Sequence, residues 1–376
     1  MRALIVIACV IVVAAIVASF ISLPYYALTP GSAQPVEPLI AVPASMQRHH
    51  RGSIDLVDVH VTPVRAIDWI FFELDSSATL LPSTEILGFE TPAQYNTEGV
   101  LDMADAQQAA TVVALHQLGY HPEVRPSGAL LYALLPGSPA ERSLVVGDVV
   151  AAVGRVPVTS AAGLATDLQS KAVGEEVVLS VRQYGHSGLH RVTLRLGSWR
   201  WQGSPDHSGI TCLPSGSRSR DKVALLVERA GQLAIPAKGQ TGRAIACLGV
   251  YQVEDAFTIS RLPFKVDLSS EGIVGPSAGL AFTLGLMQKL DRRDLTGGLK
   301  VACTGTMDIH GNVGAIGGIE QKTIAVNASG AAVFLVPRDN YKTAKAFAGP
   351  RLKVYAVSKI SQVIGILKRL GGRISR

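Results

Sequence analysis

The chain opens with an unbroken apolar stretch, residues 3–23, interrupted by only two serines. At about 1.5 Å per residue, a helix of this length reaches about 31 Å, enough to cross the hydrocarbon core of a bilayer. Pro24 ends it, and Tyr25 and Tyr26 follow, a residue type that favours the membrane interface. The pattern predicts an uncleaved transmembrane anchor over residues 1–23, with a cleaved signal peptide as the alternative.

Only Arg2 and the amino terminus flank this stretch on its N-terminal side. So short an N-terminus commonly stays in the cytoplasm. No later run in the sequence is long enough to span a bilayer without charged residues. We therefore expect a single-pass protein of the cytoplasmic membrane, whose remaining domains are soluble and extracytoplasmic.

Two periodicities follow in residues 24–121, which we expect to form an extracytoplasmic N-terminal region. Residues 54–61 alternate between polar and apolar side chains, which predicts a strand. Residues 102–118 carry apolar side chains at helical spacing, and Gly119 follows, so we expect a helix that ends there.

Residues 122–197 read as a separate, β-rich unit. A strand over 130–135 precedes a Pro-Gly-Ser-Pro-Ala turn, and further strands are expected within 144–153, 177–182 and 190–196. This order, with the Ser-Pro-Ala turn before Gly-Asp-Val-Val, resembles the PDZ domains fused to bacterial proteases.

The resemblance to PDZ domains implies that a peptide adds as a strand and that backbone N–H groups hold its terminal carboxylate. The matching stretch is Ser127, Gly128, Ala129 and Leu130. A small β-rich spacer with no peptide site is the alternative.

Residues 198–244 are rich in Gly, Ser, Pro and Arg and read as a linker or as the start of the next domain. Residues 245–376 alternate strand and helix patterns, and the chain as a whole is therefore expected to be α+β. The expected strands are 244–250, 264–268, 299–304 and 333–336, and the expected helices are 277–290, 319–328 and 360–370.

Charge and cysteine content exclude several classes of protein. The 35 Lys and Arg against 29 Asp and Glu give a net charge of only +6, with no basic stripe that would indicate nucleic-acid binding. The 4 cysteines include no CxxC pair, and no HExxH spacing occurs, so we expect no metal site and no cofactor. Cys212 and Cys247 are a candidate disulfide outside the cell, which the sequence alone does not establish.

The first candidate for chemistry is Ser277, within Gly-Pro-Ser-Ala-Gly ahead of an apolar helical run. The first N–H groups of a helix have no internal acceptors, so they can stabilise an oxyanion on a group that Ser277 attacks. The small neighbours Gly275 and Ala278 let a substrate backbone approach. A serine in this place is also an ordinary helix cap.

The second candidate is Lys322, in the first turns of a helix that follows Gly317 and Gly318. The helix dipole and apolar neighbours both disfavour an ammonium there, which lowers the pKa of a lysine and suits a general base. A surface lysine is the alternative. No histidine belongs to a recognisable catalytic triad, and His310 is expected in a loop, so a Ser–Lys pair is favoured over Ser–His.

Together these motifs are specific. The order of Gly-Pro-Ser-Ala-Gly, a Cys-Thr-Gly-Thr strand end, a Gly-Gly-Ile-Glu-Gln-Lys helix entry and Val-Pro-Arg-Asp-Asn resembles Lon-type proteases over about 263–340. With one N-terminal span and a PDZ-like unit, the chain looks like the membrane-anchored PDZ–Lon family. The resemblance implies a dyad of Ser277 and Lys322, with Thr304 positioning the lysine. Lon domains of this kind form rings, so a homo-oligomer such as a hexamer is compatible with the resemblance, although no motif in the sequence specifies the oligomeric state.

The sequence departs from ATP-dependent Lon proteases at two places. Val274 stands where these usually carry an aspartate three residues before the serine, and Thr306 stands where they carry an acid after Thr-Gly. Neither change removes the nucleophile or the base.

No GxxxxGK[ST] motif that would cradle ATP phosphates occurs in the sequence. We therefore expect an ATP-independent serine endopeptidase that cleaves unfolded or exposed protein segments at the outer face of the membrane. Two alternatives remain: a peptide-binding PDZ scaffold with an inactive protease-like domain, and a serine hydrolase acting on a non-peptide ester.

Overall fold

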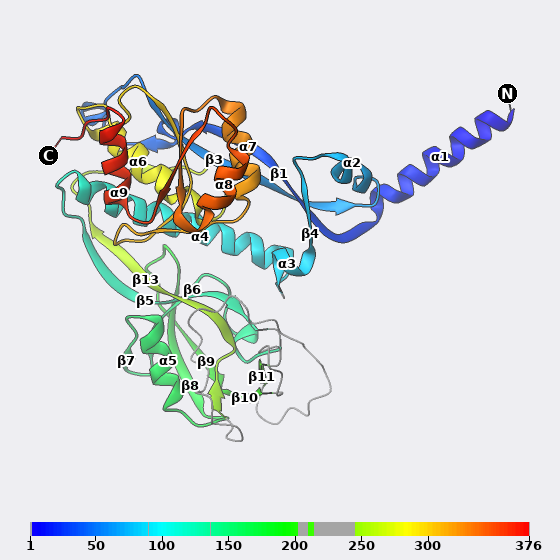
Figure 1. The fold of residues 1–376 in the computed structure, drawn as a ribbon. Helices are drawn as coiled ribbons and strands as arrows, with labels where there is room; N and C mark the ends of the chain where they lie inside the picture. The colour runs from blue at the N-terminus through cyan, green and yellow to red at the C-terminus, as the bar shows by residue number, and fades with distance from the viewer. Residues whose placement is uncertain (1, 89, 136, 202–209, 214–244, 376) are drawn as a thin grey trace. The chain divides into compact units, whose positions relative to one another are not determined.

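The computed structural model describes residues 2–88, 90–135, 137–201, 210–213 and 245–375. They fold as two compact units (Figure 1). Unit 1 combines three separate stretches of the chain, and unit 2 combines two. The stretches are 1–88, 102–122 and 262–376 for unit 1, and 89–101 and 123–261 for unit 2. Helices and strands are mixed in the chain, so the predicted α+β class is confirmed.

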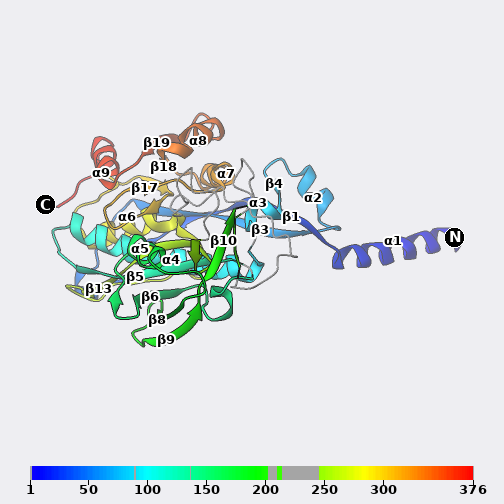
Figure 2. The same ribbon diagram turned by 90° about the horizontal axis from the view of Figure 1, so that it is seen from below.

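The apolar N-terminus forms helix α1 (Arg2–Phe20). Residues 3–20 have the length and composition of a membrane span, and none of that window is buried in the fold. Figure 2 shows α1 leaving unit 1 at the start of strand β1. The helix predicted here is present, and its large apolar side chains are exposed in the described part of the chain.

Unit 1 is built on a six-stranded sheet of order β19-β18-β15-β3-β1-β4. Strands β3, β15, β18 and β19 pair in parallel, whereas β1 pairs antiparallel to both β3 and β4. The strands are β1 (Ser22–Pro35), β3 (Ser53–Arg65), β4 (Thr79–Pro82), β15 (Lys300–Cys303), β18 (Val333–Pro337) and β19 (Lys353–Val357). Strands that pair in parallel need crossover connections, which the helices supply.

Helices cover both faces of this sheet and bury two apolar cores. Alternate strand residues point to opposite faces, so Val301 and Cys303 enter one core while Ala302 enters the other. The first core includes residues of α4 (Pro92–Gln117), α6 (Gly279–Leu290) and α9 (Ile360–Arg369), and the second includes residues of α7 (Ile319–Ser329) and α8 (Tyr341–Phe347).

Short elements complete unit 1. They are η1 (Glu37–Leu39), β2 (Ile40–Ala41), η2 (Ala44–Met46), α2 (Trp69–Leu74), α3 (Ser83–Leu87), β14 (Asp267–Leu268), η4 (Pro276–Ala278), β16 (Thr306–Met307), β17 (Val313–Gly314) and η5 (Arg338–Asn340). The strand expected over 264–268 is reduced to β14, which pairs with β2.

The N-terminal region is part of the same sheet as the C-terminal domain. Lys300 of β15 pairs with Ser53 of β3, and Cys303 pairs with Leu56, although almost 250 positions separate the strands in sequence. Residues 24–88 therefore do not stand apart as the sequence suggested, because the parallel edge of β15 is completed by β3.

Unit 2 is β-rich, with a sheet of order β13-β5-β6-β8-β9 and β7 paired with β6. A second sheet has the order β11-β10-β12. The elements are β5 (Glu123–Leu134), η3 (Ala140–Arg142), β6 (Asp148–Val153), β7 (Val156–Pro157), α5 (Ala161–Gln169), β8 (Glu176–Gln183), β9 (His190–Arg195), β10 (Gly197–Trp201), β11 (Ile210–Leu213), β12 (Ile245–Cys247) and β13 (Val250–Arg261).

The boundary between the domains differs from the one expected at residue 245. Strand β13 pairs antiparallel with β5 over almost its whole length, from Val250 opposite Leu134 to Arg261 opposite Glu123. Residues 245–261 therefore belong to unit 2, and unit 1 resumes at residue 262. Most of the expected linker, 198–244, lies outside the described residues.

The described cysteines include two free residues and one that is disulfide-bonded. Cys9 and Cys303 are free, and Cys303 is buried in the first core. Cys247 is disulfide-bonded. The side chain of Cys212 lies outside the described residues, so the predicted pairing stays a prediction.

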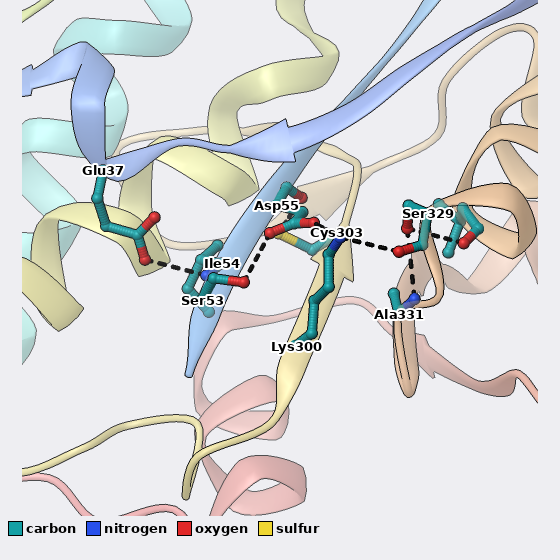
Figure 3. Close-up of polar contacts among 9 residues, drawn as sticks. Glu37, Ser53, Ile54, Asp55, Lys300, Cys303, Ser329 and Ala331 are labelled. Atoms are coloured by element: carbon teal, nitrogen blue, oxygen red, sulfur yellow. Dashed lines mark hydrogen bonds and ion pairs between the residues drawn. The ribbon is translucent and has the colours of Figure 1, made fainter. Parts of the chain in front are cut away.

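An ion pair between a buried carboxylate and a half-exposed ammonium connects the central strands of the sheet (Figure 3). The carboxylate of Asp55, on β3, is fully buried and lies 3.2 Å from the ammonium of Lys300 on β15. Ser53 Oγ donates to Asp55 Oδ1 at 2.8 Å, and Lys300 Nζ donates to the carbonyl of Ser329 at the end of α7 at 2.9 Å. The cluster therefore links two central strands to a covering helix.

The ion pair stabilises the fold because Asp55 Oδ2 has no hydrogen bond among the described residues. The ammonium of Lys300 therefore offsets the cost of burying this negative charge. We predict that Lys300→Met lowers the free energy of unfolding by about 1–3 kcal/mol, since it removes the half-exposed ammonium that compensates a buried carboxylate. Chemical denaturation followed by circular dichroism measures this. Lys342→Met, at an exposed position of α8, is the matched control and should change stability by less than about 0.5 kcal/mol. Equal stabilities of the two variants would contradict the role of the pair.

Candidate active site

Ser277 lies in the single turn η4, directly ahead of the buried helix α6. Pro276 is pre-organised for a helical start, and Gly275 precedes it with a φ of 93°. That φ is open to glycine but strained for other residues, so Gly275 fixes the entry of the chain into the turn. Gly279 is also required, because a Cβ there would lie 2.8 Å from Cβ of Met307.

Lys322 lies on α7, four residues after Gly318, whose left-handed φ of 65° starts that helix. Its backbone N–H donates to the carbonyl of Gly318 at 2.9 Å, so the lysine belongs to the first helical turn. The residue is only 2% exposed. The surface alternative for this lysine is therefore wrong.

The two side chains meet. Lys322 Nζ lies 2.7 Å from Ser277 Oγ and 3.2 Å from Thr304 Oγ1. Thr304 Oγ1 in turn donates to the backbone carbonyl of Ser277 at 3.2 Å. The structure thus brings together the serine, the lysine and the threonine that the sequence singled out.

The topology explains why residues from opposite layers meet. α6 packs on one face of the sheet and α7 on the other, and Thr304 follows directly after β15, between them. Crevices at the carboxyl ends of parallel strands are where such sheets place their ligand sites.

Backbone hydrogen bonds hold the serine turn to the end of β15. The N–H of Gly305 donates to the carbonyl of Ser277 at 3.0 Å, and the N–H of Leu280 donates to the carbonyl of Gly305 at 3.1 Å. Ser277 itself is half-buried, so its hydroxyl is held in place and still has access to solvent.

Burial sets the acidity of the lysine. Removal of the ammonium from water lowers the pKa of Lys322 from its ordinary value of 10.5 to about 8. The negative charge of Asp58 opposes this shift and favours the ammonium. About a tenth of Lys322 is therefore neutral at pH 7 and half at pH 8, and the neutral amine is the form that a general base requires.

Asp58 is a residue that the sequence analysis missed. It lies on β3, and its carboxylate accepts hydrogen bonds from the backbone N–H and the hydroxyl of Ser32 on β1. The chain at Gly31 passes so close that a Cβ there would clash with Asp58. The alternating strand pattern at 54–61 gave no signal for this role, because the packing of α7 against β1 and β3 brings Asp58 near Lys322 only in the folded protein.

The two positions at which the sequence lacks an expected acid carry side chains that do not ionise. Val274 is 42% exposed, and Thr306 is part of the short strand β16. His310 lies in an exposed turn, where its backbone N–H donates to Asp308. Ser277 Oγ instead has Lys322 as its partner, which disfavours the Ser–His alternative. No group of three potential metal ligands occurs among the residues whose placement is described.

The predicted peptide site in unit 2 differs from the structure. Ala129 of β5 pairs with Asp255 of β13 on one side and with Val150 of β6 on the other. Both edges of β5 are thus occupied where Gly128, Ala129 and Leu130 were expected to accept a peptide. Ser127 is also engaged, since its hydroxyl accepts a hydrogen bond from Arg182 at 2.7 Å. Strand addition to this sheet is confined to its edge strands, of which β13 is one.

Comparisons with known proteins identify the C-terminal part of unit 1. Residues 265–369 match the family model of the Lon protease (S16) C-terminal proteolytic domain. The Lon protease of an Aster yellows witches'-broom phytoplasma is 32% identical over 114 residues, which are 29% of this chain and 14% of that protein. The Lon protease of Rickettsia bellii is 38% identical over 97 residues, 24% of this chain and 12% of that protein. Residues 265–369 are thus similar to the Lon proteolytic domain, and the chain spans a small part of the length of these relatives.

Among solved structures, the PDZ domain of an SdrC-like protein from Listeria monocytogenes is similar to part of the chain. The sequences are 22% identical, the TM-score is 0.19, and the match covers 23% of this chain and 87% of that domain.

The buried lysine makes the site costly to fold. Below pH 8 Lys322 is protonated in both the folded and the unfolded protein, so folding carries the full free-energy cost of burying the ammonium. This cost declines between pH 8 and 10.5, where only the unfolded protein keeps the proton. Above pH 10.5 Lys322 is neutral in both states and the cost is absent. We predict that Lys322→Met raises the free energy of unfolding at pH 7 by about 1–3 kcal/mol, and that this gain shrinks from pH 8 to 10.5. Denaturant titrations across this pH range measure it. A Met variant that is less stable at every pH would show that the ammonium is well solvated in the folded protein.

Proposed function

We propose that the protein is an ATP-independent serine endopeptidase in which Ser277 is the nucleophile and Lys322 the general base. The observation that carries the proposal is the 2.7 Å contact between Lys322 Nζ and Ser277 Oγ at a buried lysine of lowered pKa. The Lon-type proteolytic domain over residues 265–369 supports peptide bonds as the substrate class.

The hydrogen bonds orient the base. A neutral lysine amine has two N–H donors and one lone pair. Thr304 Oγ1 donates to the carbonyl of Ser277, so its own lone pair receives an N–H of Lys322. The amine lone pair is then free to accept the proton of Ser277 Oγ. Thr304 is therefore a positioning residue for the proton transfer.

The reaction follows from these roles. Ser277 Oγ attacks the scissile carbonyl carbon while its proton passes to Lys322 Nζ, and the resulting ammonium gives that proton to the leaving amine nitrogen. Water then attacks the acyl carbon while one of its protons passes to Lys322 Nζ, and the ammonium returns that proton to Ser277 Oγ as the bond between Oγ and the acyl carbon breaks. The backbone N–H of Ser277 lies in the first turn of η4, where helices leave donors without internal acceptors, so it is a candidate donor to the oxyanion, together with Ala278.

Further features support two parts of this proposal. One is that cleavage needs no ATP, and the other is that the site lies outside the cytoplasm. The sequence contains no GxxxxGK[ST] phosphate cradle, so the substrates are unfolded or exposed segments of proteins. Helix α1 can anchor the chain in the membrane, and a disulfide-bonded Cys247 fits an oxidising compartment.

A peptide-binding scaffold with an inactive proteolytic domain is the second candidate. It is favoured by one observation, the exposed Val274 in place of an acid near the serine. Against it, Asp58 provides a carboxylate near the lysine from a different strand.

We predict that Ser277→Ala and Lys322→Met each lower the rate of casein cleavage at least about 10³-fold without nucleotide, while the far-UV circular dichroism is retained. The measurement compares them with the unaltered full chain in lipid nanodiscs. Ser269→Ala and Lys342→Met, both at exposed positions, are the matched controls and should retain activity. Undiminished cleavage by either site variant would exclude the dyad, and peptide binding without cleavage by the unaltered chain would favour the scaffold.

The pH dependence tests the electrostatics of the same site. Since neutral Lys322 is the active form, kcat/KM should rise with pH to a plateau with a midpoint at about 8. Asp58→Asn removes a charge that favours the ammonium, so the midpoint should move to lower pH. Glu320→Gln is the control, because residues two apart on α7 do not face each other. An unchanged midpoint in Asp58→Asn would mean that this carboxylate does not act on Lys322.

A further inference from the structure

Helix α2 (Trp69–Leu74) carries an apolar surface that the proteolytic site does not explain. Ile70, Phe71 and Leu74 are 65%, 72% and 79% exposed. Their spacing of three and four residues places them on one side of the helix. Three large side chains left in water on one short helix are unfavourable unless something covers them.

The position of α2 in the fold indicates what contacts these exposed apolar side chains. The backbone N–H of Ala66, three residues before the helix, donates to the carbonyl of Ile21 at 2.9 Å. Ile21 is the first residue after α1, and Ser22 pairs with Arg65 at the start of the sheet. Figures 1 and 2 both draw α2 beside the junction of α1 and β1. The helix thus lies where the chain leaves the proposed membrane span.

An aromatic contact holds α2 close to the end of the proposed membrane span. The rings of Trp69 and Tyr25 meet edge to face with centroids 4.9 Å apart. Tryptophan and tyrosine are enriched at the boundary between lipid and water, and Tyr25 lies on β1, five residues after the end of α1. Trp69 therefore packs toward the sheet, while Ile70, Phe71 and Leu74 remain on the uncovered side.

We propose that α2 is a second membrane contact, which inserts Ile70, Phe71 and Leu74 into the interfacial layer of the same bilayer that α1 crosses. The inference rests on the proposed anchoring by α1. Its consequence is that unit 1 is held against the membrane at two points, α1 and α2, so its orientation relative to the bilayer is fixed. An amphipathic helix of this kind lies in the plane of the interface and does not span it.

The test uses the full chain in phosphatidylcholine vesicles, with Trp199→Phe and Trp201→Phe leaving Trp69 as the sole tryptophan of the three in the sequence. Lipids brominated at shallow or deep acyl positions quench tryptophan fluorescence at the corresponding depth. We expect at least about twofold quenching of Trp69 by the shallow lipid and less by the deep one. Ile70→Ser, Phe71→Ser and Leu74→Ser, combined, should reduce the quenching to that of free solution.

The matched control combines Val145→Ser, Val156→Ser and Leu189→Ser, which remove exposed apolar side chains from unit 2 and should leave the quenching unchanged. Flotation of the vesicles in a density gradient separates the two proposals. A chain that floats with the vesicles but whose Trp69 is not quenched would overturn the role of α2 and leave the anchor intact. A chain that does not float would overturn both. Equal quenching before and after the three α2 substitutions would also exclude the insertion.

Discussion

The hydrogen bond between the buried amine of Lys322 and the hydroxyl of Ser277 is the interaction on which the account of this protein depends. It connects the turn before α6 to α7, which cover opposite faces of one sheet. The contact lies at the end of β15, where Thr304 also contacts Lys322. Neither helix places its side chain at this point alone. The parallel pairing of β15 with β3 and β18 fixes where β15 ends, and Thr304 follows that end directly, so the site depends on the sheet.

That dependence explains why the N-terminal region belongs to the same unit as Ser277 and Lys322. β3 supplies the neighbour of β15, the buried Asp55 that pairs with Lys300, and the Asp58 charge that acts on Lys322. The two acids have opposite surroundings: Asp55 is fully buried against a lysine, whereas Asp58 is only half-buried and is held by Ser32. One strand thus contributes both to the stability of the sheet and to the electrostatics of the site.

The sequence was sufficient to predict elements that depend only on neighbouring residues. The apolar run at α1, the glycine and proline before Ser277, and the two glycines before Lys322 each determine the backbone within a few residues, and their predicted elements are present. It was insufficient where pairing is long-range. Nothing in residues 250–261 shows that they return to β5, which is why the domain boundary was placed too early and why the edges of Ala129 were thought to be open. Asp58 was missed for the same reason, since an acid on an alternating strand reads as a solvent-facing residue until its neighbours are known.

The most direct test of the central claim needs no natural substrate. A fluorophosphonate reacts with an activated serine hydroxyl, and mass spectrometry locates the adduct, so the rate of modification can be followed against pH. We predict a single adduct on Ser277, a rate that rises with a midpoint at about pH 8, and no adduct in Lys322→Met. An unmodified Ser277, or a rate that is the same in the presence and absence of Lys322, would contradict the assignment of the lysine as the base.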